Sequence, residues 1–174
     1  MKHAVLFIAV SLIGLTLAPG AVAQTFTVPN VTGTSMADIY TAGAVLVSAL
    51  ESNEKEIVHI EYDIVYQGVT TTNYRMLSNR WSYTFLGFAD FRITDLDLKV
   101  SLLIDTVWVP VGQDQLNDKL PTVTVTPDAP GLYRFEMTAY SFTYPYTSGH
   151  YGLMIYHVHP DAQTTTPATD QSLH

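Results

Sequence analysis

The sequence predicts a mainly β fold with one N-terminal helix. Residues 57–67 read IVHIEYDIVYQ, in which Val58, Ile60 and Tyr62 alternate with polar side chains, the period of a half-buried strand. Seven or eight short runs of this kind can be counted along the chain, separated by turn-forming Asn, Asp, Pro and Gly. This punctuation is typical of a β-sandwich or a β-barrel.

The first residues have the layout of a secretory signal peptide. Lys2 precedes an apolar run that ends near Ala18, and Ala23 completes a small-x-small cleavage site. The run is too short to span a bilayer comfortably, so an uncleaved membrane anchor is the weaker reading. We therefore expect loss of residues 1–23, which would leave a periplasmic or secreted bacterial protein that begins at Gln24 and has no membrane insertion.

Charge and cysteine content narrow the function classes. Without Lys2, 7 basic and 16 acidic residues leave a net charge of −9, which repels a phosphate backbone and argues against nucleic acid as a partner. The chain has no cysteine, so its stability must come from its core. About 150 residues suffice to bury one. No internal repeat or shift of composition divides the chain, which predicts a single domain over residues 24–159.

The helix is expected at about residues 35–56. Ile39 and Leu46 belong to an apolar stripe with helical spacing. Ser35 can cap the N-terminus, with Asp38 three residues on. The last turn is acidic and opposes the helix dipole, so we expect fraying there. The apolar stripe indicates that the helix packs on the sandwich.

The later strands are recognised by β-branched and aromatic residues between turn signals. Residues 160–174 lack any apolar period, and we expect them to be disordered. The strands expected after the first are residues 73–76, 81–88, 91–103, 107–111, 122–126, 131–140 and 150–159.

Three motifs follow one another between Trp81 and Val158: an Asp-x-Asp-Leu strand, a Pro-x-x-x-Gly-x-Tyr hairpin and a final Tyr-x-Leu-x-Ile strand. The residues that carry them are Asp95, Leu96, Asp97, Leu98, Pro127, Gly131, Tyr133, Tyr151 and Leu153. This order resembles the bacterial pre-peptidase C-terminal domain family. The resemblance implies a jelly-roll-like antiparallel β-sandwich without a catalytic role, some relatives of which bind calcium or extracellular polymers. The chain departs from the family in its helix, in an extra strand and in having no preceding protease domain.

Asp95 and Asp97 form the first candidate site. On a strand they share one face, and the neighbouring leucines share the other, which turns both carboxylates away from the core. They are either a solvated strand face or, together with Asp114 and Asp118 of the following loop, oxygen ligands of a calcium ion. A catalytic pair is the least supported reading.

Histidines and tyrosines supply two further candidates. His157 and His159 project to one face of a strand, as a metal site requires, although their place just before a proline favours an exposed polar edge. A tyrosine-rich stretch around a proline-containing loop either binds sugar rings or protein partners or caps the core. Its members are Tyr140, Tyr144, Tyr146 and Tyr151.

No set of nucleophile, acid and base can be assembled without arbitrary choices. The sequence has no Gly-x-Ser-x-Gly, no phosphate loop and no dinucleotide fingerprint. We therefore expect an exported binding or accessory module for extracellular or envelope polymers or proteins, not an enzyme, with calcium as a candidate cofactor. The alternatives are a small metal-dependent hydrolase that uses His157 and His159, and a structural envelope component.

Overall fold

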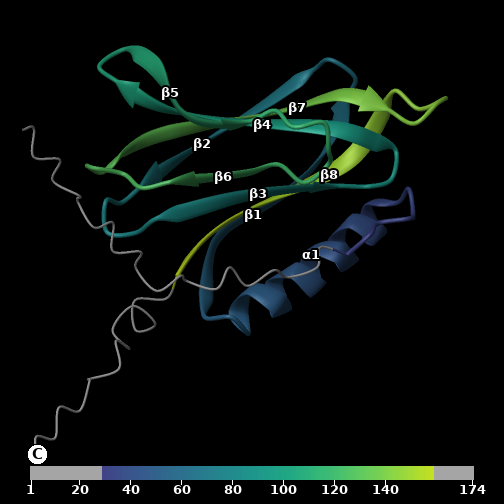
Figure 1. Cartoon of the computed structure of the whole chain (residues 1–174), viewed down its shortest axis with the longest axis horizontal. Coiled ribbons are helices and arrows are strands. Elements are labelled where there is room, and N and C mark those ends of the chain that lie inside the picture. Colours follow the sequence, from purple (N-terminus) through teal and green to yellow (C-terminus); the bar gives the residue numbers. More distant parts are fainter. Residues whose placement is uncertain (1–28, 159–174) are drawn as a thin grey trace, which may run out of the picture.

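The computed structural model describes residues 29–158, which contain one helix and eight strands (Figure 1). The prediction of a mainly β fold with one N-terminal helix is confirmed. The expected signal peptide and C-terminal tail lie outside the described residues. The elements are α1 (Met36–Glu51), β1 (Lys55–Tyr66), β2 (Thr70–Leu77), β3 (Tyr83–Ala89), β4 (Ile93–Ile104), β5 (Val107–Asp114), β6 (Thr122–Val125), β7 (Gly131–Phe142) and β8 (Ser148–Val158).

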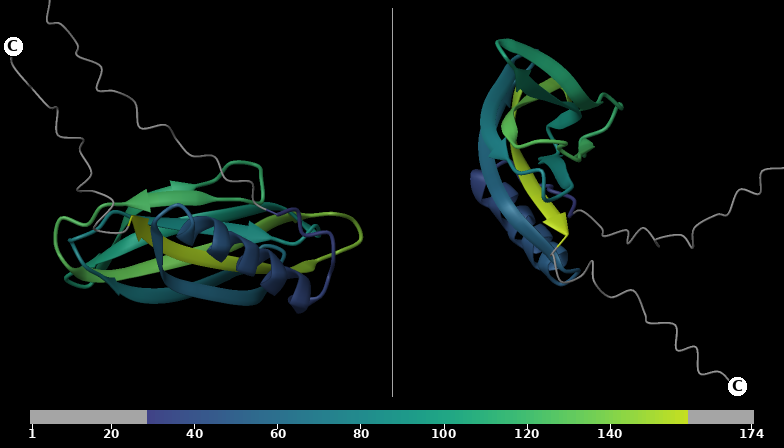
Figure 2. Two further views of the ribbon diagram at one scale, coloured as in Figure 1. Left: turned by 90° about the horizontal axis from the view of Figure 1, so that it is seen from below. Right: turned by 90° about the vertical axis from the view of Figure 1, so that its left-hand side faces the viewer.

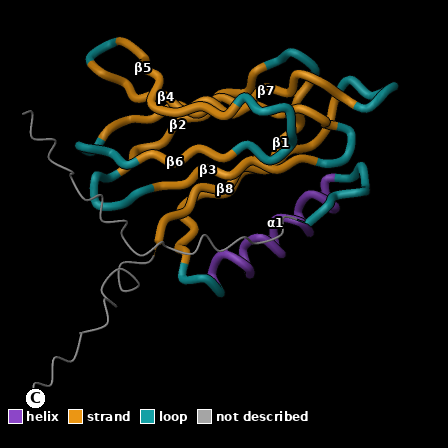
Figure 3. The backbone as a smooth tube through the Cα atoms, in the orientation of Figure 1, coloured by secondary structure: helices purple, strands orange, loops and turns teal. Residues whose placement is uncertain are grey.

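The strands form two antiparallel four-stranded sheets packed face to face, as the tube in Figure 3 shows. We call β1-β8-β3-β6 the covered sheet and β2-β7-β4-β5 the uncovered sheet. Strand β4 pairs with β5, β3 with β6, β2 with β7 and β1 with β8, so the chain is one long hairpin wound into two sheets. This is the jelly-roll arrangement, and the fold class that the family resemblance implied is confirmed.

The main core lies between the two sheets. Alternate side chains of the central strands point inward, and Phe85, Phe135 and Leu153 are completely buried there. Leu96 and Leu98 of β4 are buried in the same core, so the neighbouring aspartates face outward as the period of two predicted.

Helix α1 covers the outer face of the covered sheet, as Figure 1 and Figure 2 show. The expected capping box is present: the backbone N–H of Ser35 donates to Asp38 Oδ2 at 2.9 Å, and that of Asp38 donates to Ser35 Oγ at 3.3 Å. The helix ends at Glu51, before the expected boundary, because its acidic last turn opposes the dipole. Its packing on β3 and β8 forms a second core that includes Ile39, Leu46, Leu50, Phe88 and Met154.

The helix also explains the unusual orientation of β1. Ile60 lies opposite Met154, on the side that faces α1, whereas His59 and Glu61 face the space between the sheets. Neighbouring β2 satisfies both polar side chains: Arg75 donates to His59 Nδ1 at 3.1 Å, and an asparagine amide donates to Glu61 Oε2 at 2.9 Å. Part of the apolar face of β1 therefore packs toward the helix, although Ile60 itself is 36 % exposed, and the polar face closes the edge of the sandwich.

One outer sheet face is thus buried and the other is bare within residues 29–158. No described helix packs on β2-β7-β4-β5 (Figure 2). In the same part of the chain, no helix is long and apolar enough to cross a bilayer. The bare face is where outward-pointing side chains are free to meet a ligand.

Candidate functional site

Asp95 and Asp97 lie on the bare face, but they are not a solvated pair. Asp97 is only 9 % exposed, and Oδ1 of Asp95 is buried without a hydrogen-bond partner. Burial raises the pKa of both carboxyls, and the charge of Asp118 raises the pKa of Asp95 further. Asp95 and Asp114 act in the same way on Asp97, whereas the Gln115 side chain lowers its pKa. The reading of a solvated strand face is therefore wrong for Asp97, whereas Asp95 is half-buried.

The loop carboxylates have structural partners of their own. Asp114 accepts hydrogen bonds from the backbone N–H groups of Leu116 at 3.1 Å and of Thr122 at 2.9 Å. Asp118 accepts one at 2.8 Å from the backbone two residues further on. Both thereby hold the connection between β5 and β6. Across residues 29–158, no group of three or more acidic or histidine side chains is arranged to hold a metal ion, and calcium binding stays a prediction.

Thermal unfolding of Asp97→Asn tests the role of this buried charge. Because the pKa of Asp97 is raised above 3.8 in the fold, stability is fully present below the unfolded-state pKa and falls as pH rises toward the folded one. At pH 7 without calcium, we expect the variant to melt at a higher temperature than the wild type, with a smaller difference in acid.

If Asp97 is a calcium ligand, we expect calcium to reverse the order of the two melting temperatures. The wild type would then gain about 2.7 kcal/mol at a calcium concentration a hundredfold above the dissociation constant, and the variant would gain less. The comparison requires both proteins with excess calcium and with a chelator. Four identical melting curves would contradict both the charge penalty and the calcium prediction.

The bare face carries an aromatic cluster that we call the platform, formed by Tyr74, Trp108 and Arg134. Tyr74 of β2 and Trp108 of β5 come from the two edges of the sheet, yet their ring centroids are 5.5 Å apart. The Arg134 guanidinium from β7 lies 4.8 Å from the Trp108 ring centroid, a cation–π contact. Tyr74 remains 56 % exposed. The platform is therefore preorganised but open to solvent.

Buried polar atoms without hydrogen-bond partners gather on the same sheet. In the described part of the chain there are four, namely Asp95 Oδ1, Ser101 Oγ, Arg134 Nε and Glu136 Oε2, and all belong to β4 or β7. Arg134 Nη2 lies 3.1 Å from Glu136 Oε2, close enough for an ion pair but not aligned for a hydrogen bond. Since folded proteins pair most buried polar groups, this concentration points to a missing ligand or bound water.

A polar pocket of about 230 Å³ lies on this face beside the platform. Asp97 and Thr138 are directly opposite in the β4–β7 ladder, and Thr138 Oγ1 is 2.7 Å from Thr70 Oγ1. Ser101, which pairs with Arg134 of the platform, is four residues from Asp97 on the same strand, a span of about 13 Å. Pocket and platform therefore form one strip. The other polar residues of the pocket are Lys99, Gln115, Glu136 and Tyr140.

The predicted tyrosine group divides into surface and core members. Tyr144 is 92 % exposed, and Tyr140 and Tyr146 are exposed as well. Tyr151 is wholly buried, with its hydroxyl 2.8 Å from Thr71 Oγ1, and burial raises its pKa. The assignment of Tyr151 to a binding surface is therefore wrong, because its position on β8 faces the core.

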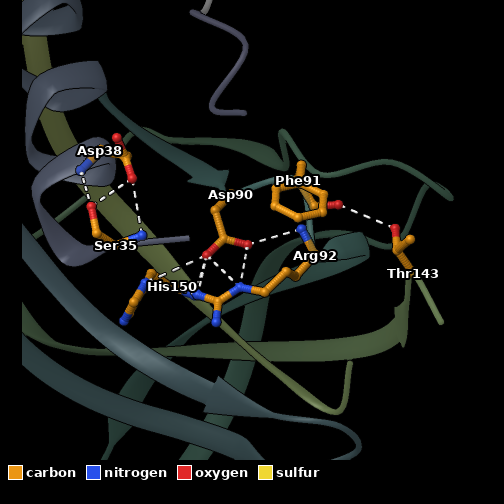
Figure 4. Close-up of polar contacts among 7 residues, drawn as sticks. All are labelled: Ser35, Asp38, Asp90, Phe91, Arg92, Thr143 and His150. Atoms are coloured by element: carbon orange, nitrogen blue, oxygen red, sulfur yellow. Dashed lines mark hydrogen bonds and ion pairs between the residues drawn. The ribbon is translucent and has the colours of Figure 1, made fainter. Parts of the chain in front are cut away.

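A buried charge cluster that we call the clamp (Asp90, Arg92 and His150) holds the tyrosine-bearing loop between β7 and β8 (Figure 4). The fully buried Asp90 carboxylate accepts from Arg92 Nη2 and from the backbone N–H groups of Arg92 and His150, each of the latter at 2.9 Å. Arg92 Nη2 also donates to His150 Nδ1 at 2.8 Å. Thr143 donates its backbone N–H to the Arg92 carbonyl at 2.8 Å. The clamp thus fixes both ends of the loop.

His157 is a core residue and not an exposed edge. It is 4 % exposed and stacks on Trp81, with ring centroids 4.7 Å apart and planes inclined by 8°. Its Nε2 lies 3.8 Å from a Glu56 carboxylate oxygen. The expectation of an exposed polar edge at His157 is therefore wrong, because the stacked pair closes one end of the sandwich. His159 lies outside the described residues.

A second cavity, of about 490 Å³, opens at the seam between β5 and β6. Its walls are mainly aliphatic and include Leu102, Val111 and Val125. Gly112 brings the two strands together beside it, since a Cβ there would meet the side chain of Val123. Polar side chains line it too, but none of the four unpartnered buried atoms lies there, so the strip on the bare face is the better candidate site.

Comparisons with known proteins add little to this geometry. No protein-family model and no curated protein sequence matches the chain. Among solved structures, the crystal structure of the Yersinia pseudotuberculosis-derived mitogen is similar at 12% identity and a TM-score of 0.39, over 61% of this chain and 88% of that one. So low a score carries no argument about function. Membership of the pre-peptidase C-terminal domain family stays a prediction.

Proposed function

We propose that the protein is an exported binding module without a catalytic role, which holds an extracellular or envelope polymer on the bare face of its uncovered sheet. The observation that carries the proposal is the gathering of the platform, the pocket and the unpartnered polar atoms on the one face that α1 leaves free. Tyrosine, tryptophan and arginine side chains packed against one another offer a large, rigid contact area at low entropic cost.

The shape and charge of the strip favour an elongated partner. Pocket and platform are about 13 Å apart along β4, so one chain-like ligand can contact both. The acidic protein repels a polyanion such as nucleic acid. A periplasmic or secreted location, supported by the signal-like residues 1–23, would bring the module to polymers of the envelope or the surroundings.

The hydrolase alternative finds little support in the geometry. His157 is buried under Trp81, so a metal could reach it only after that ring moved away. The pocket residues Asp97 and Glu136 have threonine, lysine and glutamine neighbours, which bind hydroxyl groups but provide no activated nucleophile. The pocket therefore suits recognition better than reaction.

Co-sedimentation of the mature protein with insoluble polymers tests the proposal. We expect it to pellet with at least one of peptidoglycan sacculi, cellulose and chitin, and Trp108→Ala to weaken this binding more than tenfold, because a central aromatic anchor typically contributes that much. Tyr66→Ala is the matched control, since Tyr66 is an exposed aromatic on the covered sheet. Equal sedimentation of wild type and Trp108→Ala, or none with any polymer, would refute the proposed function.

A further inference from the structure

We infer that the polar pocket on the bare face is a subsite for one neutral sugar ring of a polysaccharide. The inference rests on the proposed function and names the chemistry of its ligand. It begins with the pocket's side chains, which combine two carboxylates, an ammonium, an amide and two threonine hydroxyls within about 230 Å³.

This mixture matches the hydroxyl groups of a sugar. Each sugar hydroxyl both donates and accepts a hydrogen bond, so a pocket for one needs both kinds of partner. Asp97 can only accept, Lys99 can only donate, and Gln115 does both. A carboxylate that accepts from two neighbouring hydroxyls makes charge-assisted hydrogen bonds, which are stronger than neutral ones. Asp97 is therefore the expected anchor.

Tyr140 supplies the apolar contact that a sugar ring also needs. It is the one aromatic residue that lines the pocket, and its side chain is exposed near the C-terminal end of β7. The C–H face of a sugar ring is apolar and can pack on a phenol ring while the hydroxyls turn toward the polar wall. The pocket is smaller than the 300–1,000 Å³ typical of larger ligands, which suits a single ring.

The charges around the pocket select against acidic sugars. Asp97 is nine-tenths buried and has Asp95 and Asp114 as charged neighbours, and Glu136 Oε2 makes no hydrogen bond. Lys99 lies directly opposite Glu136 in the β4–β7 ladder and offsets part of this charge. A uronate carboxylate placed here would add another like charge to a poorly solvated site. A neutral ring adds none.

The distance to the platform predicts a dependence on chain length. A monosaccharide can fill only the pocket, whereas a longer oligosaccharide can also reach the platform, where Arg134, about 13 Å away along β4, contacts the Trp108 ring. Affinity should therefore rise from the monosaccharide to the oligosaccharide, because the second contact is then intramolecular.

Isothermal titration calorimetry of the mature protein tests the inference. The probes are hexasaccharides of glucose, galactose and N-acetylglucosamine, with the galacturonate hexasaccharide as the acidic counterpart. We expect at least one neutral hexasaccharide to bind and the galacturonate chain to bind at least tenfold more weakly. Asp97→Asn and Tyr140→Ala should each weaken neutral binding at least tenfold, the loss expected for a charged hydrogen bond or a stacking contact. Asp105→Asn and Tyr66→Ala change an exposed acid and an exposed tyrosine elsewhere and should leave binding unchanged.

Three outcomes overturn the inference: no neutral hexasaccharide binds, the galacturonate chain binds equally well, or both pocket variants bind like the wild type. The fold of each variant is verified by its melting temperature, and Asp97→Asn is expected to melt no lower than the wild type at pH 7. If Trp108-dependent sedimentation persists while these outcomes occur, only the sugar assignment fails. If sedimentation is also absent, the proposed function itself fails.

Discussion

Replacement of Asp90 by asparagine should lower the free energy of unfolding by about 3–5 kcal/mol, the range for breaking a buried ion pair through loss of one partner. The carboxylate is fully buried and accepts from the Arg92 guanidinium and from two backbone N–H groups. Asparagine keeps the shape but leaves the guanidinium without its counter-charge. Because a domain of this kind is stable by only about 5–15 kcal/mol, the loss is a large share of the total.

Urea unfolding of the variant and of the wild type measures this loss of free energy, provided that the two proteins have the same m value. Asp105→Asn is the control, since Asp105 is exposed and has a φ of 54°, a conformation that asparagine tolerates, and it should change stability by less than about 0.5 kcal/mol. Loss of the clamp should also free the loop that carries Tyr144, so chymotrypsin should cleave there sooner. A loss below about 1 kcal/mol would show that Asp90 does not hold the sandwich as described.

Leu46→Ala should destabilise the protein by about 3–5 kcal/mol, as deletions of fully buried leucine side chains do. Leu46 is wholly buried between α1 and the covered sheet, in the cluster with Phe88 and Met154. The variant leaves a cavity between α1 and the covered sheet. This packing is what makes one outer sheet face buried and the other bare. Urea unfolding again provides the measurement.

Val45 provides the matched control on the same helix. It is 50 % exposed, and Val45→Ala removes apolar atoms from a solvent-exposed position without opening a buried cavity, so stability should stay within about 0.5 kcal/mol. Equal effects of the two substitutions would mean that α1 does not pack on the covered sheet through Leu46. In that case both outer faces would be bare, and the case for a site on one of them would weaken.

The fold was largely predictable because its signals are local. The period of two in β4 correctly turned Leu96 and Leu98 inward, and the capping box at Ser35 correctly started the helix. The orientation of β1 was not predictable, because its apolar face packs against a helix and its polar face against β2. Nothing in an alternating pattern says which face meets which neighbour.

The candidate site was predictable only in part, because its members meet through the sheet order. Asp97 was identified from its place in the strand, but Tyr74 and Trp108 lie on strands at opposite edges of one sheet, and no spacing reveals that their rings touch. The clamp pairs Asp90 with His150, 60 residues away. An aspartate at the end of the strongly apolar run LGFA was the one available signal of a buried charge.

Binding of a polymer to the bare face is the central claim, and amide chemical-shift mapping tests it most directly. The isotope-labelled mature protein would be titrated with soluble fragments of the polymer with which it sediments. We expect the shifts to concentrate on the outward-facing residues of β2, β4, β5 and β7, with the Trp108 indole N–H and the Asp97 amide among the largest. Shifts confined to α1 and the covered sheet, or to the seam between β5 and β6, would contradict the account.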